Sequence, residues 1–322
     1  MKKSYYFCEL LLDAFEPKLS INVNNLLIMS ERFINPYTDY GFKKLFGTEE
    51  NKELLISFLN AMIFDREGVI TSLTYKNIEQ LGDNKDRRNC YFDVYCETQD
   101  GSNFIVEMQN ARKSYFKDRN LFYAAKPIRD QAEKGEEWDF RLNDVYMVGV
   151  MNFRFPDKEY PEDSYYHVIQ LMDVVDQHVF YDKLTLIYLE MPKLKNMTPR
   201  TDSFRDLWLY ALQNLCYTDD YPEVLQKGIF KKLYEAAAMA NMNDAQLLAY
   251  ERSQKAMLDR YSERETARDE GREEGREEGR EEGKKELRTE IIVRMKSSGI
   301  DTATIAKITG LSEEEIQSII VR

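Results

Sequence analysis

The first half of the chain alternates between stretches with helical spacing of apolar residues and stretches with the period of a strand. From Thr38 apolar positions recur every three or four residues, which predicts one broken helix or two short helices over 39–65. Residues 69–80, 89–97 and 103–110 alternate in places and are rich in β-branched or aromatic residues. This pattern predicts three strands after the helical segment.

The next elements continue the alternation of helices and strands. Residues 113–135 return to helical spacing, and residues 144–151 are almost continuously apolar, as in a strand buried on both faces. Two further strands are predicted over 165–172 and 181–190. The order from the first helix to the strand at 144–151 is therefore αβββαβ.

The C-terminal part differs in composition from the rest of the chain. Helices are predicted from Ser203 to Tyr261, after which a glycine recurs every four residues within a Gly-Arg-Glu-Glu repeat. The patterning predicts five parts: an N-terminal extension (1–29) upstream of a natural start expected at Met29, an α/β domain (30–200), a helical region (201–262), a charged helical spacer (263–288) and a small helical hairpin (289–322).

Charge and histidine content limit the kinds of catalytic and metal-binding site that the chain can form. The 322 residues include 45 Lys and Arg, 57 Asp and Glu, and two histidines, which gives a net charge of −12. Histidine bases and multi-histidine metal sites therefore have almost no ligands available, whereas carboxylates that bind a hard cation are plentiful. His167 and His178 are isolated in the sequence, and we expect both to be structural.

Targeting and redox signals indicate a cytoplasmic protein. The four cysteines lack CxxC spacing, which argues against a zinc knuckle or a disulfide framework. Glu9 and Asp13 interrupt the apolar run that a signal peptide would need. No window reaches the roughly 18 apolar residues of a membrane span. We expect reduced thiols, a soluble chain and no membrane contact.

The predicted hairpin places two carboxylates together. If residues 99–101 form a three-residue loop, Asp93 lies opposite Glu107 on the same face, about 5 Å away. A two-residue turn would instead pair Asp93 with Met108 and separate the carboxylates. Plain solvated surface is the structural alternative, although the run around Glu107 is unusually apolar for an exposed strand.

Like charges directly across a strand pair are destabilising, so this pair favours a cation between the carboxylates. We predict Mg²⁺, or alternatively Mn²⁺, bound by Asp93, Glu107 and the backbone carbonyl of Met108. Such an ion activates water and stabilises developing negative charge on a phosphate. Gln109 lies on the same face, where it could orient that water or contact a phosphate.

Several motifs together resemble a known nuclease family. They are NPYTDYGFKKLFG at residues 35–47, FDV at 92–94 and VEMQ at 106–109, followed by Arg119 and Tyr123. The combination resembles the recombination-promoting nuclease and transposase family of the PD-(D/E)XK nuclease superfamily, over roughly residues 30–285. The resemblance implies an α/β fold with a restriction-endonuclease-like αβββαβ core and a mixed central sheet, followed by a helical C-terminal region.

The resemblance also implies catalytic roles. Asp93 and Glu107 match the acidic metal ligands, and Gln109 stands where the superfamily usually has lysine, although members of this family commonly have glutamine. Asp39 would be an additional acidic catalytic residue; the structural alternative is an ion pair with Lys43.

The helix after the hairpin supplies two further residues to the implied site. Arg119 and Tyr123 lie one turn apart and would bind phosphate; the alternative is a surface arginine beside a core tyrosine.

The implied function is a Mg²⁺-dependent DNA endonuclease that hydrolyses phosphodiester bonds in recombination, mobile elements or defence. Two alternatives remain: an inactive transposase-associated scaffold or protein-interaction module, and a hydrolase of another phosphate ester. Because the chain is acidic, DNA affinity would depend on local cations and should be modest and salt-sensitive. These cations are Lys43, Lys113, Lys117, Arg119 and Lys126.

The C-terminal segments suggest partners as well as DNA. The glycine stripe of the repeat would let a second helix approach and so favours self-association; a solvated spacer is the alternative. The terminal hairpin favours oligomerisation or partner binding over a DNA-binding helix-turn-helix, because Glu313, Glu314 and Glu315 crowd its last helix.

Overall fold

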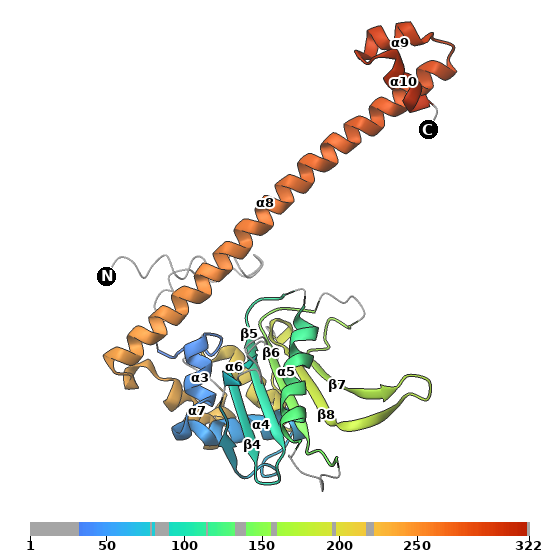
Figure 1. Ribbon diagram of the computed structural model, residues 1–322. Helices are drawn as coiled ribbons and strands as arrows, with labels where there is room; N and C mark the ends of the chain where they lie inside the picture. The colour runs from blue at the N-terminus through green and yellow to red at the C-terminus, as the bar shows by residue number, and fades with distance from the viewer. Residues whose placement is uncertain are drawn as a thin grey trace. The chain divides into compact units, whose positions relative to one another are not determined.

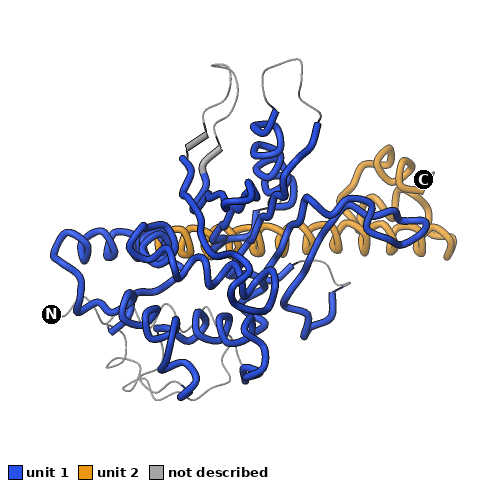
Figure 2. Tube along the Cα trace, turned by 90° about the horizontal axis from the view of Figure 1, so that it is seen from below, with its two compact units in different colours: residues 1–257 blue, residues 258–322 orange. Residues whose placement is uncertain are grey.

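The computed structural model describes residues 32–77, 79–80, 90–113, 115–132, 140–155, 160–194, 198–216 and 222–320. The chain forms two compact units, residues 1–257 and 258–322, coloured blue and orange in Figure 2. The expected extension over 1–29 lies outside the described residues, and the five-part division of the chain stays a prediction. The two units are described separately below.

A mixed six-stranded sheet forms the centre of the first unit, in the order β1-β4-β5-β6-β8-β7 (Figure 1). Its strands are β1 (Leu73–Tyr75), β4 (Val94–Thr98), β5 (Asn103–Gln109), β6 (Val145–Met151), β7 (Tyr166–Asp173) and β8 (His178–Glu190). Strand β6 pairs in parallel with β5 and β8, and the other neighbours are antiparallel. A separate short pair contains β2 (Glu79–Gln80) and β3 (Cys90–Tyr91).

Helices cover both faces of this sheet. One core contains side chains of α3 (Asp39–Phe46), α4 (Lys52–Phe64), α6 (Phe204–Asn214) and α7 (Gly228–Ala237). The opposite core contains side chains of α5 (Phe116–Asp130). Successive strand residues enter alternate cores, as Ile105 and Val106 do, because their side chains point to opposite faces. The predicted α/β fold and αβββαβ order are confirmed.

The described connections include the 3₁₀ helices η1 (Glu49–Asn51), η2 (Met191–Leu194), η3 (Glu223–Gln226) and η4 (Met239–Asn241). The stretch predicted as one strand over 69–80 forms two short strands, and the stretch over 89–97 is likewise divided. The predicted strand at 144–151 is confirmed as β6, and all its residues except Tyr146 are buried.

The turn before α3 docks onto the end of β5. The hydroxyl of Thr38 accepts the backbone N–H of Gly41 at 3.0 Å and so caps the helix. A Cβ atom on Gly41 would lie 2.1 Å from the carbonyl oxygen of Asn35, so only glycine fits there. The carbonyl of Tyr37 accepts the side-chain amide of Asn110, directly after β5. The NPYTDYG stretch therefore ties α3 to the strand that carries Glu107.

The β4–β5 hairpin has the predicted register. Residues 99–101 form its loop, where Gly101 has φ 84° and donates its N–H to the carbonyl of Thr98 at 3.0 Å. Val94 pairs with Val106, which brings Asp93 opposite Glu107 at the next position. The alternative two-residue turn is excluded by this pairing.

Strict alternation along residues 89–97 would place Phe92 on the same face of the sheet as Val94, and the structure departs from it. The ring of Phe92 packs at 5.2 Å from Tyr95 and 5.4 Å from Tyr123, in the opposite core. The cause is a bend at Asp93, which separates β3 from β4 and interrupts the period of two.

The described residues of the C-terminal unit are mainly helical, and the first of its helices begins in the first unit. Helix α8 (Asp244–Ser297) is continuous through the Gly-Arg-Glu-Glu repeat and is followed by α9 (Thr302–Thr309) and α10 (Glu313–Ile320). Their small core contains Ile292, Ile305 and Ile316. Among the described residues, none lies in a helix long and apolar enough to cross a membrane.

A glycine ends α9, and a capping box precedes α10. Gly310 ends α9 in the left-handed conformation with φ 70°. Ser312 and Glu315 have the spacing of a capping box and form one: the Ser312 hydroxyl accepts the N–H of Glu315 at 3.2 Å, and the Glu315 carboxylate accepts the N–H of Ser312 at 2.8 Å.

Candidate active site

The two predicted carboxylates meet at one end of β5. Glu107 is 1% exposed, and Asp93 lies half-buried at the bend before β4. The backbone N–H of Asp93 donates to Oε1 of Glu107 at 3.3 Å. Oδ2 of Asp93 accepts the N–H of Met108 at 2.8 Å. The solvated-surface alternative for this pair is therefore wrong.

Burial makes this arrangement electrostatically costly. Removal from water, together with the neighbouring negative charge of Asp93, raises the pKa of Glu107 to about 8. The guanidinium of Arg119 opposes that rise. Burial also raises the pKa of Asp93, although the N–H of Met108 opposes it. Two adjacent carboxyls that both resist ionisation form a site where a cation would relieve a local cost.

Arg119 reaches this pair from α5. Its Nη2 lies 3.3 Å from Oε2 of Glu107, and its guanidinium lies 4.9 Å from the ring centroid of Tyr123. The side chain is 28% exposed, so it connects the buried carboxylate with the surface. Arg119 lies beside Tyr123, which packs in the core against Phe92, and it also contacts Glu107, so phosphate binding by Arg119 and Tyr123 stays a prediction.

Gln109 and Met108 complete the end of the strand. The amide Nε2 of Gln109 donates to Oε2 of Glu107 at 3.0 Å, so this side chain holds the carboxylate in place. The N–H of Met108 binds Asp93, while a metal-binding role for its carbonyl stays a prediction.

Asp39 is more exposed than the other predicted site residues. Its carboxylate pairs with Lys43 at 2.9 Å, one turn along α3, as in the structural alternative. Both charges nevertheless act on the pKa of Asp93, which Lys43 lowers and Asp39 raises. The pair therefore belongs to the electrostatic surroundings of the carboxylates.

Comparison with known proteins decides the family. Residues 36–267 match the family described as PD-(D/E)XK nuclease family transposase. The chain belongs to this family. No curated protein and no solved structure matches the chain at a significant level. The resemblance carried by the motifs is thus confirmed, and the family indicates a nuclease-type hydrolase with DNA as substrate.

PD-(D/E)XK nucleases use divalent metals, and the residues at the end of β5 fit such an ion. Asp93 and Glu107 offer hard carboxylate oxygens within one buried site, which suits Mg²⁺ or Mn²⁺. Burial raises the pKa of both carboxyls despite the hydrogen bonds and the arginine beside them, so a cation would favour their ionised forms. The identity of the metal is left to the proposal below.

Sequence reasoning missed a second buried polar cluster, at the end of β8. Oε1 of Glu190 lies 2.7 Å from Nε2 of His167 and 2.8 Å from Nζ of Lys193. Oε2 of Glu190 accepts the N–H of Phe155 at 2.7 Å. These contacts fix the segment after β6, so His167 has the structural setting expected of it. The overlooked signal was an acid at the end of the apolar run LTLIYLE, the same signal that marked Glu107.

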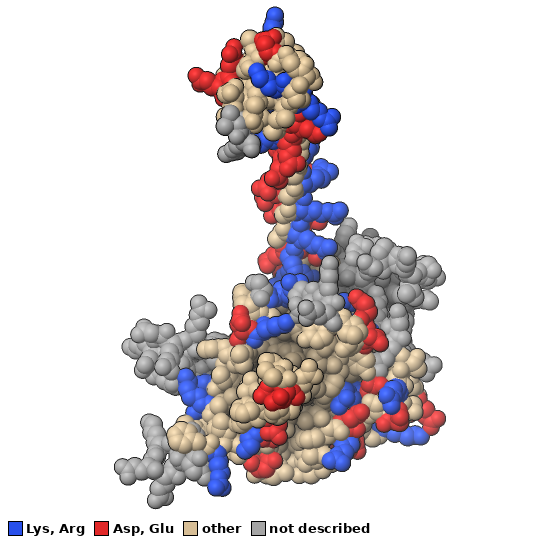
Figure 3. All heavy atoms as spheres, turned by 90° about the vertical axis from the view of Figure 1, so that its right-hand side faces the viewer, with Lys and Arg blue, Asp and Glu red and all other residues tan. Residues whose placement is uncertain are grey.

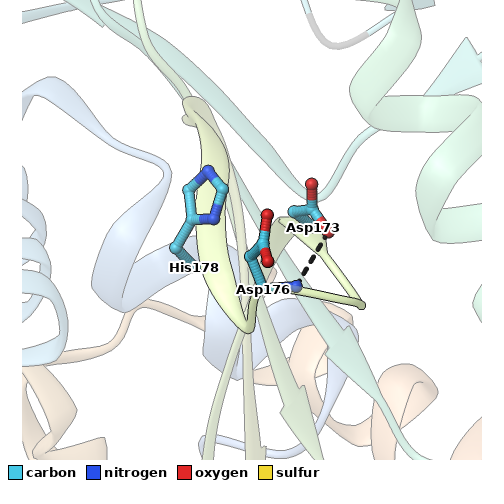
Figure 4. A group of neighbouring side chains, drawn as sticks. All are labelled: Asp173, Asp176 and His178. Carbon is cyan, nitrogen blue, oxygen red and sulfur yellow. Dashed lines mark hydrogen bonds between the residues drawn. The ribbon is translucent and has the colours of Figure 1, made fainter.

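A third group of metal-type ligands lies at the turn of the β7–β8 hairpin (Figure 4). Candidate ligand atoms of Asp173, Asp176 and His178 all lie within 4.8 Å of one another. Asp173 already accepts the N–H groups of Val175 at 2.9 Å and Asp176 at 3.1 Å. The group is largely exposed, and its hydrogen bonds account for the turn itself, so it serves below as a comparison site.

Proposed function

We propose that this protein is a Mg²⁺-dependent DNA endonuclease that hydrolyses phosphodiester bonds, with Mn²⁺ as an alternative metal. The observation that supports this most strongly is the buried pair of Asp93 and Glu107, with Arg119 beside it. Recombination, mobile elements or defence against foreign DNA are the settings that the family suggests.

In this proposal Asp93, Glu107 and the carbonyl of Met108 hold the metal. When bound, the ion lowers the pKa of a water molecule and stabilises negative charge on the phosphate. Gln109 orients Glu107 through its amide N–H, and its carbonyl oxygen is available to align a water molecule. These residues would fix the reacting groups in place without a histidine base.

Arg119 would bind the phosphate. Its guanidinium is planar and always charged, so it can exchange part of its contact with Glu107 for two phosphate oxygens. The ring of Tyr123 under the guanidinium would keep it oriented. Asp39 and Lys43 would adjust the charge around Asp93.

The proposal also covers the cellular location of the protein and its self-association. We expect the protein to act in the cytoplasm, where the free thiols of Cys96 and Cys216 would stay reduced. We also expect self-association through the C-terminal unit. Its core has three fully buried isoleucines, while Leu287, Ile291 and Ile308 remain exposed and could pack against a second copy.

Nicking of supercoiled plasmid with Mg²⁺ tests the catalytic proposal. Asp93→Asn and Glu107→Gln should each lower the rate by roughly a hundredfold or more, because each removes charge at the reacting centre. Asp173→Asn at the hairpin turn is the matched control and should cleave like wild type. Equal activity of wild type and both site variants would refute the assignment, and an inactive wild type would favour the scaffold alternative.

A further inference from the structure

Helix α5 and the residue before it carry a stripe of alternating aromatic and cationic side chains. Arg119, Phe122 and Lys126 lie within about 60° of arc on the helix. Tyr115, the N-cap residue, directly precedes the first turn, and its carbonyl accepts the N–H of Arg119 at 3.0 Å. The rings of Tyr115 and Phe122 are each 55% exposed. Figure 1 shows α5 beside the sheet, and no other described helix or strand of the first unit covers the side of α5 that faces away from the sheet. We call these four residues the α5 stripe.

The α5 stripe is continuous with the candidate active site. Arg119, its second member, contacts Glu107 at 3.3 Å. At a rise of about 1.5 Å per residue, Tyr115 and Phe122 lie about 5–6 Å from Arg119 along the helix axis, one on each side. A substrate phosphate at Arg119 would therefore bring its neighbouring nucleotides to the two exposed rings.

The charge around α5 indicates which class of ligand this surface would bind. Residues 112–130 contain six Lys or Arg and two Asp, a net charge of 6 − 2 = +4 within a chain of −12. From the β7 side, by contrast, positive and negative side chains are intermingled over the first unit with uncharged surface between them (Figure 3). The region around α5 is thus a local cationic segment that complements a polyanion.

The exposed rings favour unpaired bases. Exposed aromatic residues interleaved with cations are the arrangement that proteins use to bind single-stranded nucleic acid, where each base can stack on a ring. In a duplex the base faces are covered by their neighbours, so rings on a helix surface gain little from it. An apolar protein partner would not need the alternating cations.

We propose that the α5 stripe binds unpaired nucleotides beside the scissile phosphate, so that single-stranded or locally melted DNA is the preferred substrate. This inference rests on the proposed nuclease function. Tyr115 and Phe122 stack on bases on either side of the phosphate held by Arg119. Lys126 pairs with Asp130 and its side chain is 12% exposed, so it would exchange that ion pair for a backbone phosphate further along the helix.

A binding experiment tests the stripe without cleavage. The full-length Glu107→Gln variant is titrated, in Mg²⁺, into a single-stranded oligonucleotide containing 2-aminopurine and into the matched duplex. Adding Tyr115→Leu or Phe122→Leu should weaken single-strand binding by roughly 5- to 150-fold and relieve the quenching of 2-aminopurine, while duplex binding stays unchanged. Phe122→Tyr should retain stacking and single-strand binding.

Leu121→Ala provides the matched control. Leu121 is 51% exposed on the same helix but lies outside the stripe, so its removal should leave both affinities unchanged. Leucine variants that bind single strands like the parent, or that lose duplex and single-strand binding equally, would overturn the inference. Circular-dichroism melts confirm that each variant is folded.

A cleavage assay tests the proposed role of the α5 stripe separately from the proposed nuclease activity. Wild-type protein with Mg²⁺ should cut circular single-stranded DNA faster than relaxed plasmid, and Phe122→Leu should remove that preference. If wild type cuts plasmid and Phe122→Leu leaves the preference unchanged, the proposed role of the α5 stripe is wrong while the proposed nuclease activity is retained. If nothing is cut but the leucine variants lose single-strand binding, the stripe stands and the nuclease is wrong.

Discussion

Substitution of Asp93 by Asn should stabilise the metal-free protein while it abolishes the response to metal. Asparagine keeps the size of the side chain, and its carbonyl oxygen can still accept the N–H of Met108 that Asp93 accepts at 2.8 Å. The substitution therefore removes mainly the negative charge that raises the pKa of Glu107.

The magnitude follows from the spacing of about 5 Å that is usual for directly opposed residues in an antiparallel pair. Two unit charges at that separation and an effective dielectric constant of about 20 repel by about 3 kcal/mol. Incomplete ionisation of Glu107 and the loss of the attraction between Asp93 and Lys43 reduce this gain. A net stabilisation of about 1–2 kcal/mol is expected, equivalent to a rise in Tm of about 2–8 °C for a unit of this size.

The stability gained by Asp93→Asn should depend on pH, and the pKa of Glu107 fixes the direction of that dependence. The pKa of Glu107 rises to about 8 in the folded protein, above its ordinary value, so the folded state binds the proton more tightly than the unfolded state. The associated stability is fully present below the ordinary pKa and is lost as pH rises to about 8. The advantage of Asp93→Asn should therefore be small at pH 6, where Glu107 is protonated, and larger at pH 9.

Thermal melts of wild type, Asp93→Asn and the control Asp173→Asn, in EDTA at both pH values, measure this difference. Saturating Mg²⁺, at about 100 times its Kd, should then stabilise wild type by about 2.7 kcal/mol and leave Asp93→Asn unchanged. An Asp93→Asn protein less stable than wild type in EDTA at pH 9, or one that keeps its Mg²⁺ response, would refute the reasoning.

For three other substitutions, the surrounding residues determine whether the protein is stabilised or destabilised. Gly41→Ala should destabilise the first unit by about 3 kcal/mol in urea denaturation, because the added Cβ would meet a backbone carbonyl oxygen at 2.1 Å; a neutral result would contradict that contact. Gly275→Ala has open space and should strengthen helix α8 by about 1 kcal/mol in circular-dichroism melts; weaker self-association instead would indicate a helix contact at the glycine stripe. Lys193→Met should cost about 3–5 kcal/mol in urea denaturation, since Glu190 would lose a buried cation; an unchanged midpoint would show that His167 compensates alone.

The sequence was most informative where local geometry decides position. The loop at 99–101 sets the register of β4 and β5, so the opposition of Asp93 and Glu107 could be predicted by counting residues. The apolar run around Glu107 likewise indicated burial before the fold was known. In both cases the relevant neighbours lie within about one hairpin of each other.

Contacts between distant segments could not be predicted in this way. The bend at Asp93 that moves Phe92 into the other core depends on packing against Tyr123, some thirty residues later. The cluster of His167, Glu190 and Lys193 requires the pairing of β7 with β8, and His167 alone gave no sign of it. Strand order depends on such long-range contacts, which alternation within one strand does not encode.

Charge balance gives a physical account of glutamine at position 109. With both carboxyls ionised, Asp93, Glu107 and Arg119 sum to −1 + −1 + 1 = −1, and the amide of Gln109 adds nothing while still holding Glu107 at 3.0 Å. A divalent cation would bring this sum to +1, which one phosphodiester charge neutralises. A lysine at 109 would leave the site neutral before metal binding and so weaken the attraction for the cation. Because α5 already supplies a guanidinium beside Glu107, the strand itself can carry a neutral hydrogen-bond donor.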